Sequence, residues 1–284
     1  MTAGAIPFRW DLSRREQLGR LPEAPPYIEP YPDFVAELRP CCVRVLALAG
    51  DSQLVFVGRS PESLFDYLSG VLAETSWSER LVLLNLSLYR YTAADLSRAE
   101  LAAVRQQFQH LGLDPARIAS GPRPLALVDV IASGGTLGTL QALLLDWARE
   151  EGVDPAAVRR RLRVVGLVVQ GKNSPNTWRW YQRVEWAADY PRSALKSVSI
   201  PYVLWHDLGE EQKKVSRWNP PYAWGSAEMA RPPRDYYHLM ALREALGVFE
   251  RGRDPGERER FAAQLAAQPE MRHRWLRQLV LELR

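Results

Sequence analysis

One stretch, Leu125–Leu145, constrains the fold of this 284-residue chain more than any other. It begins with the segment Leu125–Val130, which is apolar except for Asp129. A run this apolar is typical of a strand buried on both faces in a parallel sheet. A short loop rich in glycine follows, and leucines then recur at helical spacing from position 137 to 144. The stretch therefore predicts a buried strand, a tight loop and a helix.

The loop between strand and helix is suited to binding an anion. Its residues are Ala132, Ser133, Gly134, Gly135 and Thr136. At the start of a helix, free backbone N–H groups and the helix dipole favour a negative group, most often a phosphate. Asp129 lies at the carboxyl end of the strand, where ligands of open α/β sheets bind. The spacing also fits an ordinary turn with Ser and Thr as helix caps, so the residues alone leave both interpretations open.

The segment Val128–Thr136 resembles the signature of type I phosphoribosyltransferases. In that family the loop binds the 5′-phosphate of phosphoribosyl pyrophosphate (PRPP), and two successive acidic residues before it bind the ribose hydroxyls. The resemblance thus assigns the 5′-phosphate to 132–136 and a ribose hydroxyl to Asp129, the candidate catalytic residue. The first acidic position is Val128 here, which halves the charge facing the ribose and leaves turnover open.

A second strand–loop–helix junction precedes the first. Gln53–Val57 is predicted as a strand, and leucines at positions 64, 68 and 72 predict a helix, with Ser60 or Ser63 as its cap. In phosphoribosyltransferases the corresponding loop binds pyrophosphate, so the resemblance assigns that group to Arg59 and Ser60. A capped helix beside an exposed arginine is the alternative.

The region after the predicted strand Leu162–Val169 is irregular, aromatic and basic, and the family often places nucleobase contacts there. The resemblance makes Lys172, Trp178 and Trp180 candidates, although for each Trp we favour the alternative of packing against the core or a dimer partner. The strand predicted over 197–205 adds two further base-binding candidates, Trp205 and Asp207, and its Pro201 predicts an edge position.

The remaining pattern predicts an α/β fold with a mainly parallel sheet flanked by helices. Further strands are expected at Cys42–Leu48 and Leu81–Leu88, and further helices at Leu96–Leu111 and Pro155–Arg160. We divide the chain into a Pro- and aromatic-rich arm (1–40), a phosphoribosyltransferase-like α/β core (41–211), and a linker with a small helical appendage (212–284). The appendage is predicted to hold helices over 236–249, 257–267 and 271–283.

Composition adds few restrictions. The formal net charge is +4 and comes mostly from arginine, which suits anionic ligands such as phosphates or nucleic acid but proves neither. No apolar run reaches the length of a membrane span, and the first twenty residues lack the pattern of a signal peptide, so we expect a cytoplasmic protein. The two cysteines, Cys41 and Cys42, are adjacent and are expected to be buried rather than bridged.

The resemblance implies a PRPP-dependent phosphoribosyltransferase of nucleotide metabolism. Mg²⁺ would be held mainly by PRPP's own oxygens, with no protein ligand assigned, and a nucleobase-like acceptor would displace pyrophosphate. The alternative is a non-catalytic PRPP-sensing or nucleic-acid-binding regulator on the same fold, which Val128 and the helical interval 96–111 favour. A sheet protein without a PRPP site is the third interpretation, and a homodimer is left open.

Overall fold

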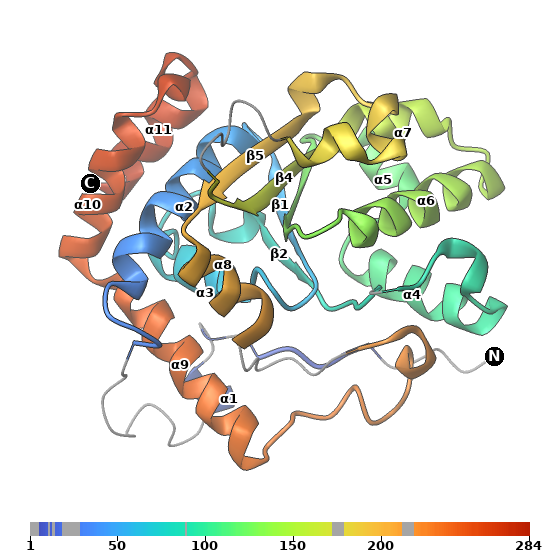
Figure 1. Ribbon diagram of the computed structural model, residues 1–284, viewed down its shortest axis with the longest axis horizontal. Helices are drawn as coiled ribbons and strands as arrows, with labels where there is room; N and C mark the ends of the chain where they lie inside the picture. The colour runs from blue at the N-terminus through green and yellow to red at the C-terminus, as the bar shows by residue number, and fades with distance from the viewer. Residues whose placement is uncertain are drawn as a thin grey trace.

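The computed structural model describes residues 6–10, 12, 15–18, 29–88, 90–171, 179–211 and 219–284. Within them, five strands form a single all-parallel sheet in the order β2-β1-β3-β4-β5, with helices on both faces (Figure 1). This confirms the predicted fold class. The strands are β1 Gln53–Val57, β2 Leu81–Leu84, β3 Leu125–Val130, β4 Leu162–Val169 and β5 Leu195–Ile200.

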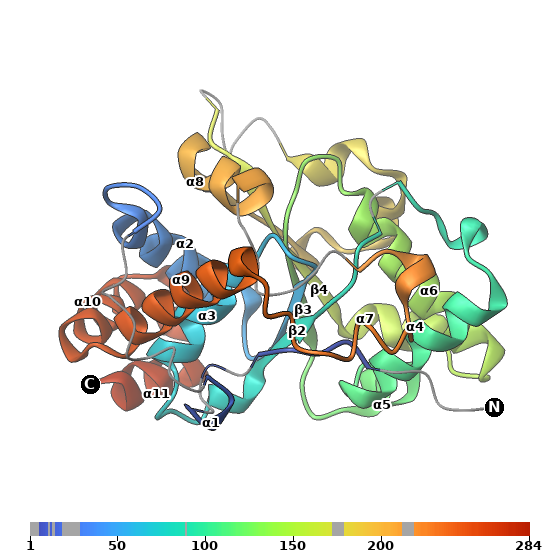
Figure 2. The ribbon, with the colours of Figure 1, turned by 90° about the horizontal axis from the view of Figure 1, so that it is seen from below.

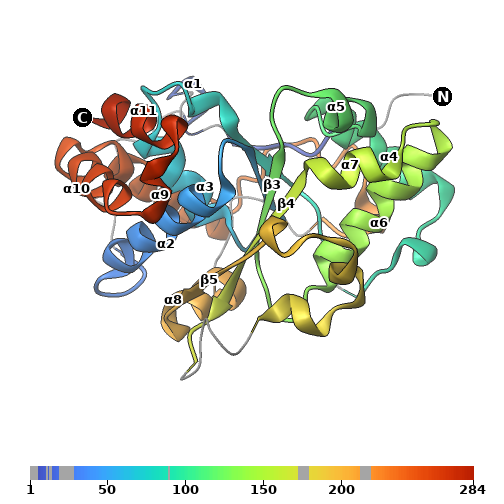
Figure 3. The same cartoon turned by 90° about the horizontal axis from the view of Figure 1, so that it is seen from above.

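Helices pack on each face of the sheet because side chains of successive strand residues alternate between faces. Leu54 and Phe56 of β1 enter one hydrophobic cluster, whereas Val55 and Val57 enter the other. Figure 3 shows the two groups of helices on either side of the strands. The first face carries α2 Phe34–Ala49, α3 Glu62–Val71, α8 Tyr202–His206, α9 Tyr236–Arg253, α10 Pro255–Ala266 and α11 Arg274–Leu283. The second carries α4 Arg98–His110, α5 Pro115–Ser120, α6 Gly135–Glu150 and α7 Pro155–Arg161.

Short elements complete the described chain. They are α1 Arg15–Leu18, a π-helical turn η7 Asp207–Glu211, and the 3-10 turns η2 Ser78–Arg80, η3 Ala93–Asp95, η4 Trp180–Arg183, η5 Glu185–Asp189, η6 Arg192–Ala194, η8 Pro221–Ala223 and η9 Pro269–Arg272. Among the described residues, no helix has both the length and the hydropathy that a membrane crossing needs.

The strand predicted at Cys42–Leu48 is wrong, because these residues lie inside helix α2. Ten of its sixteen residues are buried, so the helix shows an almost continuous apolar run without a clear period. Such a run cannot be distinguished from a buried strand by pattern alone. Gly50 ends the helix at a φ of 69°, and the chain then enters β1. Cys41 and Cys42 are both buried, as predicted.

Several boundaries also differ from the prediction. β2 ends at Leu84 rather than Leu88, and β5 ends at Ile200, because Pro201 has no N–H to continue the ladder and instead precedes α8. β5 does lie at the edge of the sheet, as predicted. The predicted serine caps of α3 are wrong, since its N-cap is Pro61 and no side chain caps it.

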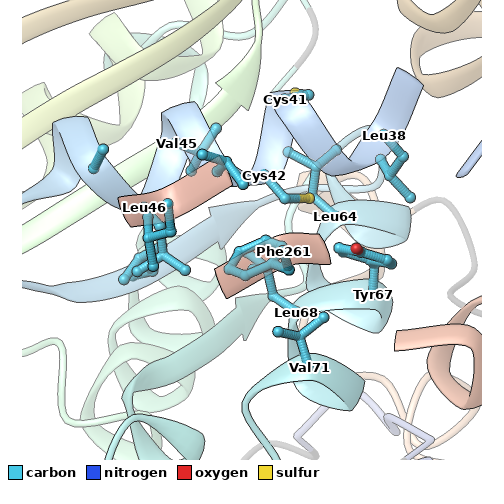
Figure 4. Packing of buried hydrophobic residues seen from close by; sticks show 14 of the residues in the cluster. Leu38, Cys41, Cys42, Val45, Leu46, Leu64, Tyr67, Leu68, Val71 and Phe261 are labelled. Atoms are coloured by element: carbon cyan, nitrogen blue, oxygen red, sulfur yellow. The ribbon is translucent and has the colours of Figure 1, made fainter. Parts of the chain in front are cut away.

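The three predicted C-terminal helices are present and pack directly on the core. Helix α9 lies against α3, and both helices carry a glycine at the crossing. A Cβ on Gly70 would lie 2.1 Å from the carbonyl oxygen of Phe249, and a Cβ on Gly252 would lie 2.4 Å from that of Tyr67. Figure 4 shows Phe261 of α10 among side chains of α2 and α3. The C-terminal helices therefore share one hydrophobic cluster with the sheet.

Candidate functional site

The connections of neighbouring strands β1 and β3 leave the sheet on opposite faces. After β1 the chain enters α3 on the first face, and after β3 it enters α6 on the second face. The two strands are paired in parallel, so both loops start at the same edge of the sheet. In open α/β sheets, ligands bind in the crevice that forms at such a switch in direction.

A cavity of about 670 Å³ occupies this position. Its walls come from the loop after β1 (58–60), the segment after β2 (85–88) and the loop after β3 (129–136). The fourth side is formed by Trp205, Gly209, Glu210 and Asn219. The structure thus brings together the two loops that the sequence singled out, and both face an open space large enough for a sugar phosphate.

The backbone of the loop after β3 is arranged as an anion site requires. Gly134 is the N-cap of α6 with φ 83° and ψ 5°, a left-handed conformation that favours glycine. A larger residue would also be crowded at this position, because a Cβ there would lie 3.3 Å from a methyl group of Val184. No side chain caps α6, and the amide of Gly135 reaches only the hydroxyl of Ser133, at 3.4 Å.

Several amides of this loop are available to a ligand. Within the described chain, the N–H groups of Ala132, Ser133 and Thr136 donate to no protein atom. Ala132, Ser133 and Gly135 are exposed, and all of them line the cavity. The amides and the helix dipole behind them provide a positive potential without a charged side chain.

Asp129 lines the same cavity but is only 8% exposed. Burial raises the pKa of its carboxyl group to about 8, and a hydrogen bond from the backbone of Val130 opposes that shift. Val128 is fully buried and belongs to the hydrophobic cluster on the first face of the sheet. The position that is acidic in phosphoribosyltransferases is therefore part of the core here.

The loop after β1 supplies the cation of the site. Arg59 is exposed and Ser60 is half-buried, and both line the cavity. Gly58 before them adopts a φ of 74°, and its amide donates to the carbonyl oxygen of Leu84 in β2 at 2.9 Å. The loop is thereby held beside the end of the sheet with the arginine free to turn toward a ligand.

The structure places only some of the base-binding candidates at the cavity. Trp205 lines the cavity from helix α8, whereas Asp207 is not among the lining residues. Burial is the main cause that raises the pKa of the Tyr31 hydroxyl, followed by Glu37, and the charge of Asp207 adds to that shift. Lys172 and Trp178 lie outside the described residues.

Trp180 is a packing residue, so the base-stacking interpretation of it is wrong. Its side chain is 2% exposed and lies against Gly134 and Gly166. A Cβ on Gly166 would lie 2.6 Å from the indole nitrogen of Trp180. The ring packs against the loop after β3 and is too deeply buried to stack on a ligand.

Asn85, Glu210 and Asn219 line the cavity and were missed at the sequence level. Asn219 is 1% exposed; its carbonyl oxygen accepts from the amide of Ser87 at 3.0 Å, and its side-chain amide donates to the carbonyl oxygen of Asn85 at 2.9 Å. These bonds attach Asn219 to the segment that follows β2. Asn85 fell within the overextended prediction for β2, and nothing near Asn219 in the sequence indicates its partner.

No family model, curated protein or solved structure matches this chain. The structure establishes the general architecture of the chain. The all-parallel, five-strand sheet with helices on both faces is compatible with a phosphoribosyltransferase-like core. Function must therefore be argued from the cavity itself.

Proposed function

We propose that this chain binds Mg–PRPP in the cavity at the β1/β3 switch and transfers its phosphoribosyl group to a nitrogenous, nucleobase-like acceptor with release of pyrophosphate. The observation that carries the proposal is that two separate loops, 58–60 and 132–136, each between a strand and a helix, line one cavity together with Asp129. A ligand with two phosphate-bearing ends fits such a pair of loops better than a ligand with one.

Each wall has a role in this proposal. The amides of 132–136 bind the 5′-phosphate, because the N-terminus of α6 directs its dipole there. Arg59 and Ser60 bind the pyrophosphate, and Asp129 accepts a hydrogen bond from a ribose hydroxyl. Trp205 offers an aromatic surface to the acceptor. Mg²⁺ would be carried by the oxygens of PRPP and would neutralise part of the negative charge of the leaving pyrophosphate.

The chemical step needs positioning rather than a covalent protein intermediate. A ring nitrogen of the acceptor attacks the anomeric carbon, the bond from that carbon to the pyrophosphate oxygen breaks, and the acceptor nitrogen loses its proton. Positive charge develops on the ribose ring during this exchange. An ionised Asp129 would stabilise that charge, and the two loops would hold donor and leaving group in line.

A second function, PRPP binding without turnover, is supported by one observation. Val128 is buried in the core, and burial raises the pKa of Asp129 to about 8, so neither of the two positions that the resemblance places at the ribose carries a full negative charge near pH 7. A PRPP-sensing or nucleic-acid-binding regulator needs the loops but not that charge.

Calorimetric titration with Mg–PRPP, followed by a pyrophosphate-release assay over a panel of nucleobases, separates these functions. The proposal expects saturable binding and release that depends on one class of base. Binding with no release on any base would support the regulator. Absence of binding would favour the alternative that both loops are ordinary helix N-termini without a ligand.

A further inference from the structure

The N-terminal arm is fastened to the body of the protein on both sides of Arg9. The amide of Phe8 donates to the carbonyl oxygen of Met229 at 2.7 Å. On the other side, Trp10 and Leu12 belong to a small hydrophobic cluster that includes Leu242 of α9. Figure 2 shows this segment running past the ends of the strands toward α1. The arm therefore has a fixed path at Arg9.

Arg9 forms an ion pair with Glu62, the first residue of α3. The arginine side chain is 20% exposed and the glutamate side chain is fully buried. Two nitrogens of the guanidinium, Nε and Nη2, are buried without a hydrogen-bond partner in the described chain. A buried arginine held in this way needs its carboxylate, and the carboxylate needs it, because either charge alone would be costly to bury.

Glu62 in turn fixes the loop after β1. Its amide donates to the carbonyl oxygen of Arg59 at 3.1 Å and closes the turn from 59 to 62. The other end of the loop is held by the bond from Gly58 to β2. Arg59 and Ser60, which line the cavity, lie between these two fixed points.

We infer that Arg9 is a positioning residue, which holds the Gly58–Pro61 loop through Glu62 and so sets the affinity of the cavity for the second phosphate-bearing end of its ligand. This inference rests on the proposed function. Arg9 does not touch the ligand, since it is not among the residues that line the cavity. Among the described residues, no backbone hydrogen bond joins the loop after β3 to the arm, so binding of a ligand's first phosphate there should not depend on Arg9.

The test compares Mg–PRPP with ribose 5-phosphate, which lacks the pyrophosphate. The double variant Arg9→Met/Glu62→Gln removes both charges of the ion pair, so that neither Arg9 nor Glu62 is left buried without its partner. The control is Arg258→Met/Glu74→Gln, which removes an Arg–Glu pair at the other end of α3 whose arginine is 17% exposed. Arg9→Lys is the conservative variant.

The double variant at Arg9 should lose about tenfold in affinity for Mg–PRPP, as expected for one weakened contact to a charged group, and keep its affinity for ribose 5-phosphate. Arg9→Lys should restore most of the loss, and the control should match the wild type for both ligands. An equal loss for both ligands, or none, would overturn the positioning role.

Hydrogen exchange gives a readout that needs no ligand. The amides of Gly58 and Glu62 should exchange faster in the double variant at Arg9 than in wild type or control. Unchanged protection would overturn the inference even if PRPP binds. If the wild type binds neither ligand while protection at 58–62 falls as expected, the proposed function fails and the mechanical link survives without its role in binding.

Discussion

Burial of Asp129 makes the stability of the folded protein depend on pH. Its pKa of about 8 means that the folded protein keeps a proton that the unfolded chain releases above pH 4. Unfolding therefore releases protons between about pH 4 and 8, and stability falls as the pH rises through that window. In the unliganded cavity this carboxyl group is therefore mostly protonated near neutral pH.

Replacing Asp129 by Asn should stabilise the free protein, by about 2 kcal/mol near pH 7, because the neutral amide does not have to take up a proton on folding as the buried carboxyl group does. The gain should be small at pH 4 and grow toward pH 8, as measured by urea unfolding at several pH values. The same variant should bind Mg–PRPP more weakly, by on the order of 1–3 kcal/mol. Asp146→Asn, at an exposed position of α6, is the control. A pH-independent effect would contradict the burial argument.

Gly134 tests the backbone of the phosphate-type loop. Substitution by Ala should destabilise the protein by about 1–2 kcal/mol, because the left-handed conformation is strained for any side chain. A further cost comes from the contact with Val184. Gly152→Ala is a matched control, since its φ is 70° but no atom lies within 4 Å of its Cβ position. In thermal unfolding, Gly134→Ala should have a lower midpoint temperature than Gly152→Ala. Equal midpoints would show that the loop shifts to relieve the contact with Val184.

At the scale of elements, the hydrophobic pattern predicted strands and helices correctly where the apolar residues form a short continuous run or repeat with a clear period. Strands β3 and β4 have the predicted bounds, because a buried parallel strand is a short apolar run between turns. Helix α2 was misread because burial on several sides removes the period that distinguishes helix from strand. Helix α8 was missed because the five residues after Pro201 are too few to show a helical period.

The N-terminus of α6 can be blocked without unfolding the helix. Gly135→Asp places a carboxylate in the first turn, where the helix dipole stabilises it, and the Cβ meets nothing closer than 3.6 Å. The variant should therefore be as stable as wild type but lose at least tenfold in affinity for Mg–PRPP through repulsion of its phosphate. Gly135→Ala, which adds only the Cβ, should bind within about twofold of wild type. Equal affinity of the Asp and Ala variants would place the phosphate elsewhere.

At the scale of the whole molecule, the C-terminal helices complete the core. Phe261, Leu265 and Leu276 lie in the same cluster as α2, α3 and the first face of the sheet. Their removal would expose that cluster to water. Deleting residues 236–284 should therefore abolish cooperative unfolding, as followed by circular dichroism during a thermal scan. A truncated chain that still unfolds cooperatively would show that the α/β core is independent.

The sequence revealed the two loops of the cavity but not the walls between them. Asp129 lies at the carboxyl end of a predicted strand, and the loop 132–136 and Arg59 follow predicted strands, so local pattern identifies them. Asn219 and Glu210 come from distant segments, and only tertiary packing brings them to the cavity. Arg9 acts through a pair separated by 53 positions, which no local pattern encodes.

The most direct test of the account is a crystal structure of the protein with Mg–PRPP. The account predicts the 5′-phosphate about 3 Å from the amides of 133–136, as in ordinary N–H···O hydrogen bonds, with the pyrophosphate beside Arg59. Density for the ligand outside this cavity, or an empty cavity in crystals of a protein that binds Mg–PRPP in solution, would contradict it.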